Sequence, residues 1–156
     1  MREILFRGKR DGDGKWVYGS LILADEYCCI LEAPENVHPM DYPYLDGDLG
    51  TIDGYATPVD KATVGQFTGF GDRNGKRIFE GDIVKVHNEI RSVVFDARMG
   101  SFEFNDKDPV GNVDSLCLCC DHDCCEIIGN IHDNPEILII REVFQNDYTR
   151  SARLRS

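Results

Sequence analysis

The sequence contains no apolar run that approaches the roughly 20 residues required to cross a bilayer. Its amino-terminal stretch, MREILFRGKR, is interrupted by charges and lacks the continuous apolar segment of a signal peptide. The sequence also shows no internal repeat. We therefore expect a cytoplasmic protein that does not associate with membranes.

Positive charge is scarce as well. The 156 residues include 28 acidic and 17 basic side chains, a net charge of −11. Residues 11–60 contain eleven acids and one base, and residues 92–140 contain ten acids and two bases. Such a surface repels phosphate backbones and anionic lipids, so nucleic acid is a disfavoured partner. The simplest interpretation is a solvated acidic face, and the alternative is an acidic face for a basic partner or a mimic of nucleic acid.

One basic window interrupts this acidity and keeps a nucleic-acid-associated regulator as an alternative function. It covers residues 76–91 and contains Lys76, Arg77, Lys85 and Arg91. Because affinity for nucleic acid depends largely on lysine and arginine, these residues would have to form the contact surface.

Short apolar runs that alternate with glycine and asparagine turns predict a mainly β chain. Residues 2–31 are expected to form a β-meander, in which the turn Asp11–Gly14 leads into a return strand from Lys15 to Leu23. Trp16, Tyr18 and Ile22 share one face of that strand, and Tyr27–Leu31 forms the next strand. Residues 33–60 hold four of the six prolines and many acids, which predicts a long irregular insert.

The segment 63–105 contains five short strands separated by tight turns, which predicts a strongly bent sheet or small barrel. Asn74-Gly75 is expected at a hairpin tip, with Gly75 at positive φ. A strand within residues 124–131 should complete the sheet, so the barrel core spans about 63–131. Four side chains are expected in its interior: Val84, Val86, Val93 and Phe95.

Residues 106–114 are expected to form a loop, and Leu116–Cys120 a strand. Asn134-Pro135-Glu136 has a capping residue, a proline at the first helical position and an early acid, which together predict a helix that runs to about residue 145. We expect a single domain over residues 1–146 and a frayed tail over 147–156.

Three parts of the chain resemble the YopX family. The strongest is the segment from Thr63 to Val84, which reads TVGQFTGFGDRNGKRIFEGDIV. The opening residues MREILFR and the later EIIGNIHDNPEIL resemble the two ends of the family. The resemblance implies a small protein encoded by phages or prophages and built on an SH3-type β-barrel, and it implies no particular biochemical activity. The acidic stretch 33–60 and the cysteine-rich stretch 117–125 depart from the family pattern.

The cysteine-rich segment 117–125 is the strongest candidate for chemistry. Cys117, Cys120, His122 and Cys124 could supply four zinc ligands, or the thiols could support a metal- or thiol-dependent protein. However, zinc sites normally take ligand pairs from two separated turns, and no second C-x₂-C pair exists. We therefore expect reduced cysteines that pack as small hydrophobes, with no metal and no cofactor.

No other pattern indicates catalysis. Asp11–Gly14 begins like a calcium-binding loop, but Lys15 and Ile22 occupy positions that require ligands. The histidines are scattered, and no catalytic motif surrounds them. The sequence therefore predicts no catalytic residues and no enzyme. It favours a β-barrel module that binds a protein partner or assembles with itself.

Overall fold

The computed structural model describes residues 3–25, 27–32, 56–87, 89–105 and 118–139. They form antiparallel sheets with only short helices, so the predicted mainly β class is confirmed. The chain divides into two compact units, Met1–Phe67 and Thr68–Ser156. Among the described residues, no helix has the length and apolarity needed to cross a membrane.

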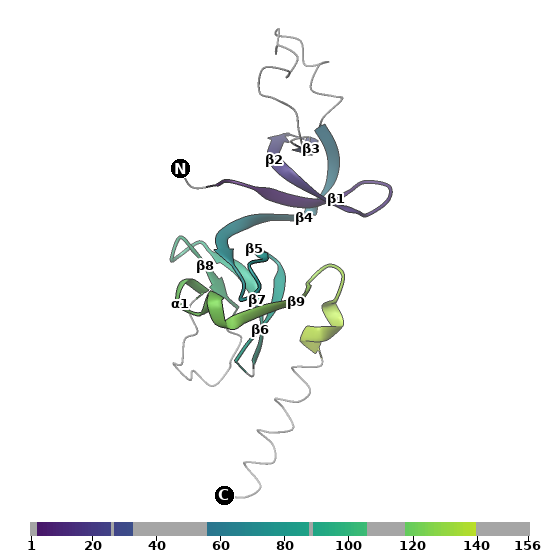
Figure 1. Ribbon diagram of the computed structural model, residues 1–156. Helices are drawn as coiled ribbons and strands as arrows, with labels where there is room; N and C mark the ends of the chain where they lie inside the picture. The colour runs from purple at the N-terminus through teal and green to yellow at the C-terminus, as the bar shows by residue number, and fades with distance from the viewer. Residues whose placement is uncertain (1–2, 26, 33–55, 88, 106–117, 140–156) are drawn as a thin grey trace, which may run out of the picture. The chain divides into compact units, whose positions relative to one another are not determined.

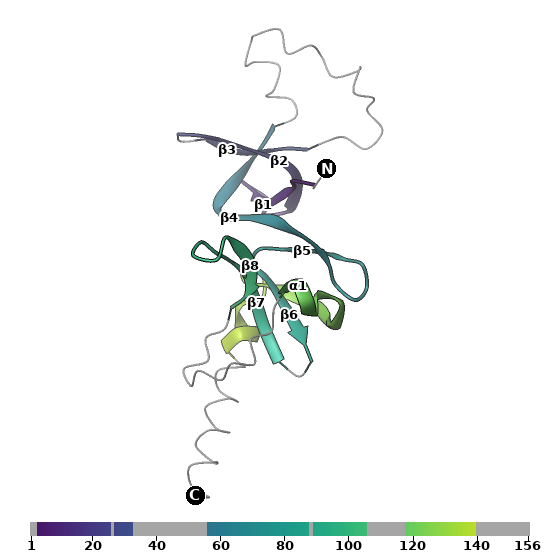
Figure 2. The same cartoon turned by 90° about the vertical axis from the view of Figure 1, so that its left-hand side faces the viewer.

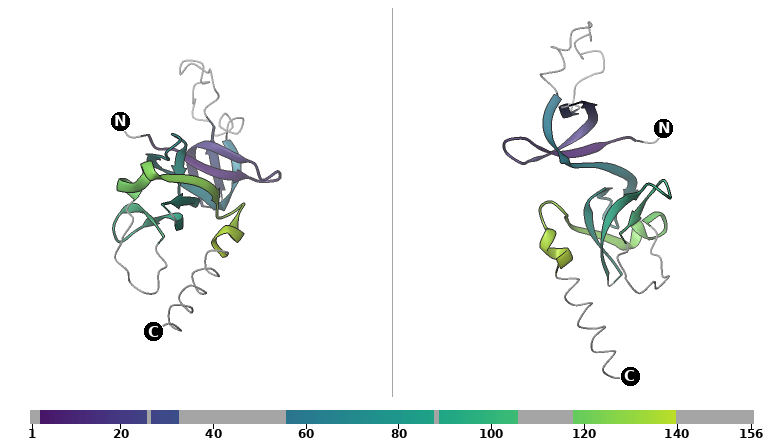
Figure 3. Two further views of the ribbon diagram at one scale, coloured as in Figure 1. Left: turned by 60° about the horizontal axis from the view of Figure 1, so that its bottom comes forward. Right: turned by 180° about the vertical axis from the view of Figure 1, so that it is seen from behind.

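The first unit is built on β1 (Phe6–Arg10), β2 (Trp16–Ala24), β3 (Tyr27–Leu31) and the first part of β4 (Ala56–Gly71). β1 pairs with β2 and β4, and β3 also pairs with β2 and β4. Within this unit each of these strands therefore has two neighbours (Figure 1), and the later part of β4 also pairs with β5. The predicted turn at residues 11–14 joins β1 to β2, and its glycines have positive φ (Figure 3, right).

The two faces of this unit differ in character. The inner face packs Val17, Ile30 and Val59 into a core. Trp16 and Tyr18 lie on the opposite face, as predicted, and Tyr18 is 47% exposed. The guanidinium of Arg7 lies 4.7 Å from the centre of a Trp16 ring. This cation–π contact holds the only tryptophan of the sequence against β1.

The second unit contains β5 (Arg77–Phe79), β6 (Asp82–Val86), β7 (Glu89–Asp96), β8 (Ser101–Phe104) and β9 (Cys125–Asn130). Four strands form a sheet in the order β8-β7-β6-β9, of which β8, β7 and β6 are labelled in Figure 2. The predicted strand within residues 124–131 therefore joins the sheet beside β6. The buried core consists of Ile78, Val84, Val86, Val93, Phe104, Leu118 and Cys125.

The expected strand at Leu116–Cys120 is wrong where the structure describes it. Leu118–Asp121 forms the helical turn α1, and His122–Cys124 continues as a 3-10 helix. The alternation of apolar residues in this segment was interpreted as a strand. In the structure Leu118 is fully buried and anchors a helical turn instead. Residues 135–139 are helical, which confirms the predicted helix start, and its extension to 145 lies outside the described residues.

Two further expectations need correction. Phe95 is 47% exposed and not interior, because β6 pairs with β7 only as far as Ser92 and Phe95 lies beyond that register. Its ring packs edge-on against Phe102 at a centroid distance of 5.2 Å. Residues 56–60 are not part of an irregular insert but begin β4, and Val59 among them is 3% exposed. The rest of the predicted insert, residues 33–55, and the predicted loop at 106–114 lie outside the described residues.

The hairpin tip at Asn74-Gly75 is confirmed, and Gly75 has a φ of 76°. A Cβ at this position would meet no atom within 4 Å, so a substitution here tests backbone strain alone. Gly75→Val should lower the free energy of unfolding by about 1–3 kcal/mol. Chemical denaturation measures the loss, and Gly75→Asn, which tolerates positive φ better, should lose less. Equal unfolding midpoints for all three proteins would contradict the assignment.

Candidate functional site

The pairing of β3 is incomplete on one side. β3 pairs with β2 along its whole length but with β4 only over its last three residues. This second register ends where Cys29 lies opposite Pro58, and at the next residue, Val59, β4 switches to β1. In the described part of the first unit, Tyr27 and Cys28 therefore have a strand neighbour on one side only. A groove of about 520 Å³ lies at this junction.

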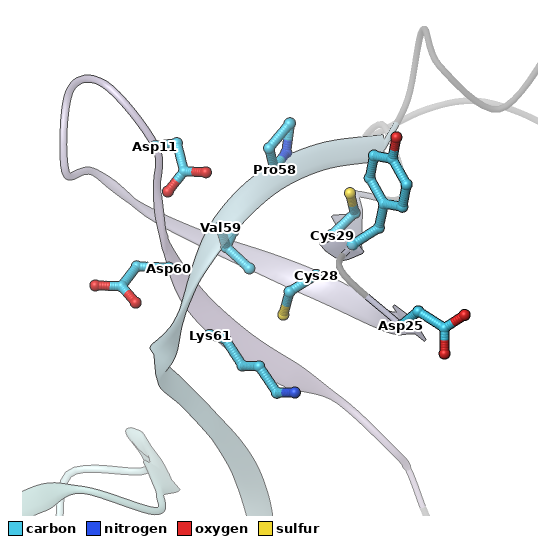
Figure 4. Close-up of a pocket in the computed structure, with 9 residues that line it drawn as sticks. Asp11, Asp25, Cys28, Cys29, Pro58, Val59, Asp60 and Lys61 are labelled. Atoms are coloured by element: carbon cyan, nitrogen blue, oxygen red, sulfur yellow. The ribbon is translucent and has the colours of Figure 1, made fainter.

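The groove is acidic. Asp11 comes from the β1–β2 turn, Asp25 from the turn after β2, and Asp60 from β4 (Figure 4). Among the described residues that line the groove, Lys61 is the single basic one. Three carboxylates from three separate segments against one ammonium give the groove a net negative charge, which favours cationic groups.

Directly after the groove, β4 deviates from regular pairing with β1. The β1–β4 register shifts between Arg7 and Lys9. There the Thr63 hydroxyl accepts a hydrogen bond from the Lys9 N–H at 2.8 Å and donates one to the Asp60 carbonyl at 2.7 Å. The Asp60 carboxylate in turn accepts the Ala62 N–H at 2.9 Å. These bonds replace ladder bonds, so the bulge that directs β4 is a satisfied part of the fold.

The thiol chemistry of the groove does not suit nucleophilic catalysis. Burial raises the pKa of the Cys28 thiol, and the neighbouring Cys29 raises it further, whereas Lys61 acts in the opposite direction. Since the thiolate is the reactive form, a raised pKa keeps Cys28 protonated and unreactive. The arrangement therefore suits binding.

The side chains of the cysteine-rich segment 117–125 that the structure describes lie in different environments. Cys125 is fully buried in the core, and burial raises the pKa of its thiol to about 11, whereas Cys124 is exposed. The Nδ1 atom of His122 lies 3.0 Å from the Gly71 carbonyl oxygen, and its ring stacks on Phe70. Cys117 and the side chains of Cys119 and Cys120 lie outside the described residues. Within the rest, no three histidine, cysteine or acidic side chains form a group that could hold a metal.

We predict that residues 117–125 bind no stoichiometric metal. Cys125 belongs to a hydrophobic core that does not require a metal to form, and the other thiols crowd into one short segment. Elemental analysis of protein purified without chelators should give far less than one zinc per chain, and EDTA should leave the melting temperature unchanged. Near one zinc per chain, with a large loss of stability in EDTA, would contradict this.

In the second unit, two aspartates of the segment that carries the family resemblance stabilise turns of the fold. The buried Asp72 accepts hydrogen bonds from the N–H groups of Asn74, Lys76 and Ile127, at 2.9, 2.9 and 3.1 Å. The Asp82 carboxylate, 2% exposed, accepts the Phe79 N–H at 2.8 Å. These carboxylates fix the β4–β5 and β5–β6 turns, and Asp72 also ties the first of them to β9.

The basic window does not form one surface. Lys85 lies opposite Ile90, whereas Arg91 lies opposite the buried Val84, so Lys85 and Arg91 lie on opposite faces of the sheet. Arg91 is only 6% exposed, and its Nε donates to the Glu89 carboxylate at 2.9 Å. Lys76 and Arg77 are exposed, as is Lys85.

The sequence prediction did not identify the groove. Asp11 and Cys28 were correctly placed on a turn and a strand, but Asp60 was assigned to the insert. A possible signal was the β-branched and proline-containing Thr57-Pro58-Val59, since proline is tolerated at strand irregularities and edges.

These features define a mainly β protein with an acidic groove where one strand leaves its neighbour. Residues 5–139, most of the chain, match the family described as YopX protein. The protein therefore belongs to the YopX family.

One solved structure extends the comparison. The chain resembles the crystal structure of protein EF1440 from Enterococcus faecalis with a TM-score of 0.51 and 21% sequence identity. The match covers 88% of this chain and 99% of that chain, and at this identity it supports the fold alone. No curated protein matches the chain.

Proposed function

We propose that the protein is a non-enzymatic accessory protein of a phage or prophage that acts in the cytoplasm of the host cell. It binds a protein partner, or a second copy of itself, through the groove at the β3–β4 junction. The observation that carries the proposal is the interrupted pairing of β3, because a strand with one neighbour beside a groove can accept an extended segment of another chain.

We also propose that residues 63–131, which follow the groove in the sequence, form an SH3-type barrel. Support comes from the antiparallel sheet β8-β7-β6-β9 and from the tight turn between β4 and β5, which follow the expected order. Membership in the YopX family supports the phage origin through the resemblance described above.

The titratable groups support binding over catalysis. Asp72 and Asp82 are used to hold turns, and Cys125 is part of the core. The raised pKa of Cys28 disfavours a thiolate in the groove. The separation of Lys85 from Arg91 gives a nucleic-acid interface little support.

Photocrosslinking from the groove tests the proposal. Tyr27 lines the groove and is 74% exposed, so p-benzoylphenylalanine can replace it with little disturbance. Met99 provides a matched control in the second unit, since it is 73% exposed and lies in the β7–β8 turn. Both variants would be expressed in the cell that naturally produces the protein and irradiated there.

The expected result is a discrete adduct from position 27 that position 99 does not give. An adduct of twice the chain mass would identify a second copy, and another mass would identify a partner protein. Identical adduct patterns from both positions, or none from position 27, would contradict a binding role for the groove.

A further inference from the structure

Building on the proposed function of the groove, we infer that its occupant is an extended peptide segment with a lysine or arginine side chain. The backbone of this segment pairs with β3 at Cys28. Its cationic side chain lies in the groove that Asp11, Asp25 and Asp60 line.

Backbone direction at the junction supports the strand-like pairing. The Pro58 carbonyl accepts the Asp11 N–H at 3.0 Å, so the backbone groups of Pro58 point toward β1. Because successive residues of a strand direct these groups to opposite sides, those of Thr57 point toward β3, where Ile30 lies opposite. Two residues before Ile30, Cys28 directs its N–H and C=O to the same side. They therefore face the junction where the β3–β4 register has ended.

Charge decides which side chain fits. The described lining of the groove has three carboxylates and one ammonium, within a chain of net charge −11. The local charge favours a cation in the groove, and the charge of the whole protein steers basic partners toward it. An acidic segment would be repelled both by the groove and by the net charge of the whole protein.

The remaining lining suits the aliphatic part of a long basic side chain. Pro58 provides exposed apolar surface on β4, and Tyr27 provides an exposed aromatic ring (Figure 4). Lysine and arginine place their methylene stems on such surfaces while the charged end remains with polar groups. A short acidic or small polar side chain would leave this surface uncovered.

Removal of the Lys61 charge should affect the affinity for a basic peptide in the opposite direction to removal of a carboxylate. The Lys61 ammonium is the one positive group that the described residues bring to the lining, so it opposes a cationic occupant. Removal of this charge should strengthen binding of a basic peptide, whereas removal of a carboxylate should weaken it. A purely steric groove would not distinguish the two changes in this way.

The test uses a fluorescein-labelled peptide of alternating lysine and valine, with the full-length protein and fluorescence anisotropy as readout. A peptide of alternating glutamate and valine controls for charge. A lysine–valine peptide interrupted by proline controls for backbone pairing, since proline cannot donate to a strand. Hydrogen exchange at the Cys28 amide, followed by NMR, reports pairing directly.

The variants are matched in charge. Asp25→Asn with Asp60→Asn should weaken the lysine–valine peptide about tenfold, because two charge pairs are lost. Asparagine tolerates the φ of 33° at Asp25 and can still accept the hydrogen bond at Asp60. Asp123→Asn with Glu136→Gln removes the same charge from exposed positions of the second unit and should change binding less than twofold. Lys61→Gln should tighten binding about threefold, and Lys85→Gln should leave it unchanged.

Several results would overturn the inference. Equal losses in the two double variants would show that only the net charge of the protein attracts the peptide. Equal affinity for the glutamate–valine peptide would exclude a basic side chain, and an unprotected Cys28 amide in the complex would exclude strand pairing. Each result leaves a crosslinked partner at position 27 standing, so the inference can fail while the proposed function survives.

Discussion

Replacement of Gly19 by alanine is expected to lower the free energy of unfolding of the first unit by about 3 kcal/mol or more. A Cβ at this position would lie 2.0 Å from the carbonyl oxygen of Leu31 and 3.0 Å from a methyl carbon of Ile30. The nearest obstacle is backbone and cannot rotate away. The β2–β3 ladder, which places Ser20 opposite Leu31, would have to shift to admit one methyl group.

Trp16 makes the measurement selective. It is the only tryptophan of the sequence and lies on β2, so its fluorescence in urea follows the unfolding of the unit that contains Gly19. Ser20→Ala is the control, since Ser20 is exposed and should change stability by less than about 0.5 kcal/mol. A Gly19→Ala protein with the wild-type unfolding midpoint would show that β2 and β3 are not as closely paired as described.

Removal of the Asp72 carboxylate should destabilise the second unit by about 3 kcal/mol. Asp72 is 5% exposed and accepts three backbone N–H groups. Asp72→Ala would leave these donors without their acceptor, in a turn that the side chain also ties to Ile127 on β9. Asp72→Asn retains one acceptor oxygen and should lose less. Hydrogen exchange at the amides of β6 and β9 measures both losses.

The same carboxylate makes stability depend on pH. Burial acts to raise the pKa of Asp72, but the backbone N–H groups of Ile127, Lys76 and Asn74 lower it more, so the pKa lies below its usual 3.8. A carboxyl whose pKa is lower in the folded state stabilises the fold above the unfolded-state pKa. This stabilisation is lost as the pH falls through the folded-state value.

Wild-type stability should therefore fall below about pH 4 more steeply than that of Asp72→Asn. Asp13 and Asp96, whose pKa values are also lowered, remain in both proteins, so the difference between the curves isolates Asp72. Parallel pH curves for the two proteins would contradict the role assigned to this carboxylate.

Much of the fold could be predicted because the turns and strands depend on local sequence. Asn74-Gly75 and Asp11–Gly14 form turns through their own backbone preferences, and Val84 and Val86 alternate into the core as period-two patterning requires. Phe95 has the same alternation, but its exposure depends on how far β6 extends beside it. The length of β6 beside Phe95 is a property of tertiary structure, and the residues around Phe95 carry no sequence signal for it.

The groove could not be predicted for a related reason. Its lining combines Asp11, Cys28 and Asp60, which become neighbours only because β4 leaves β3 after Pro58 and joins β1. A register change between strands that are distant in sequence has no periodicity of its own. The role of Asp72 could be deduced more readily from the sequence. An aspartate in a turn typically accepts the N–H of the residue two positions later, here Asn74.

One measurement tests directly both that the groove binds a partner and that it does so through a basic, extended segment. Protein with p-benzoylphenylalanine at position 27 would be irradiated with its natural partner present, in the presence of excess lysine–valine or glutamate–valine peptide. We expect the lysine–valine peptide to abolish the adduct and the glutamate–valine peptide to leave it intact. An adduct that persists undiminished with both peptides would contradict a groove that binds its partner through a basic, extended segment.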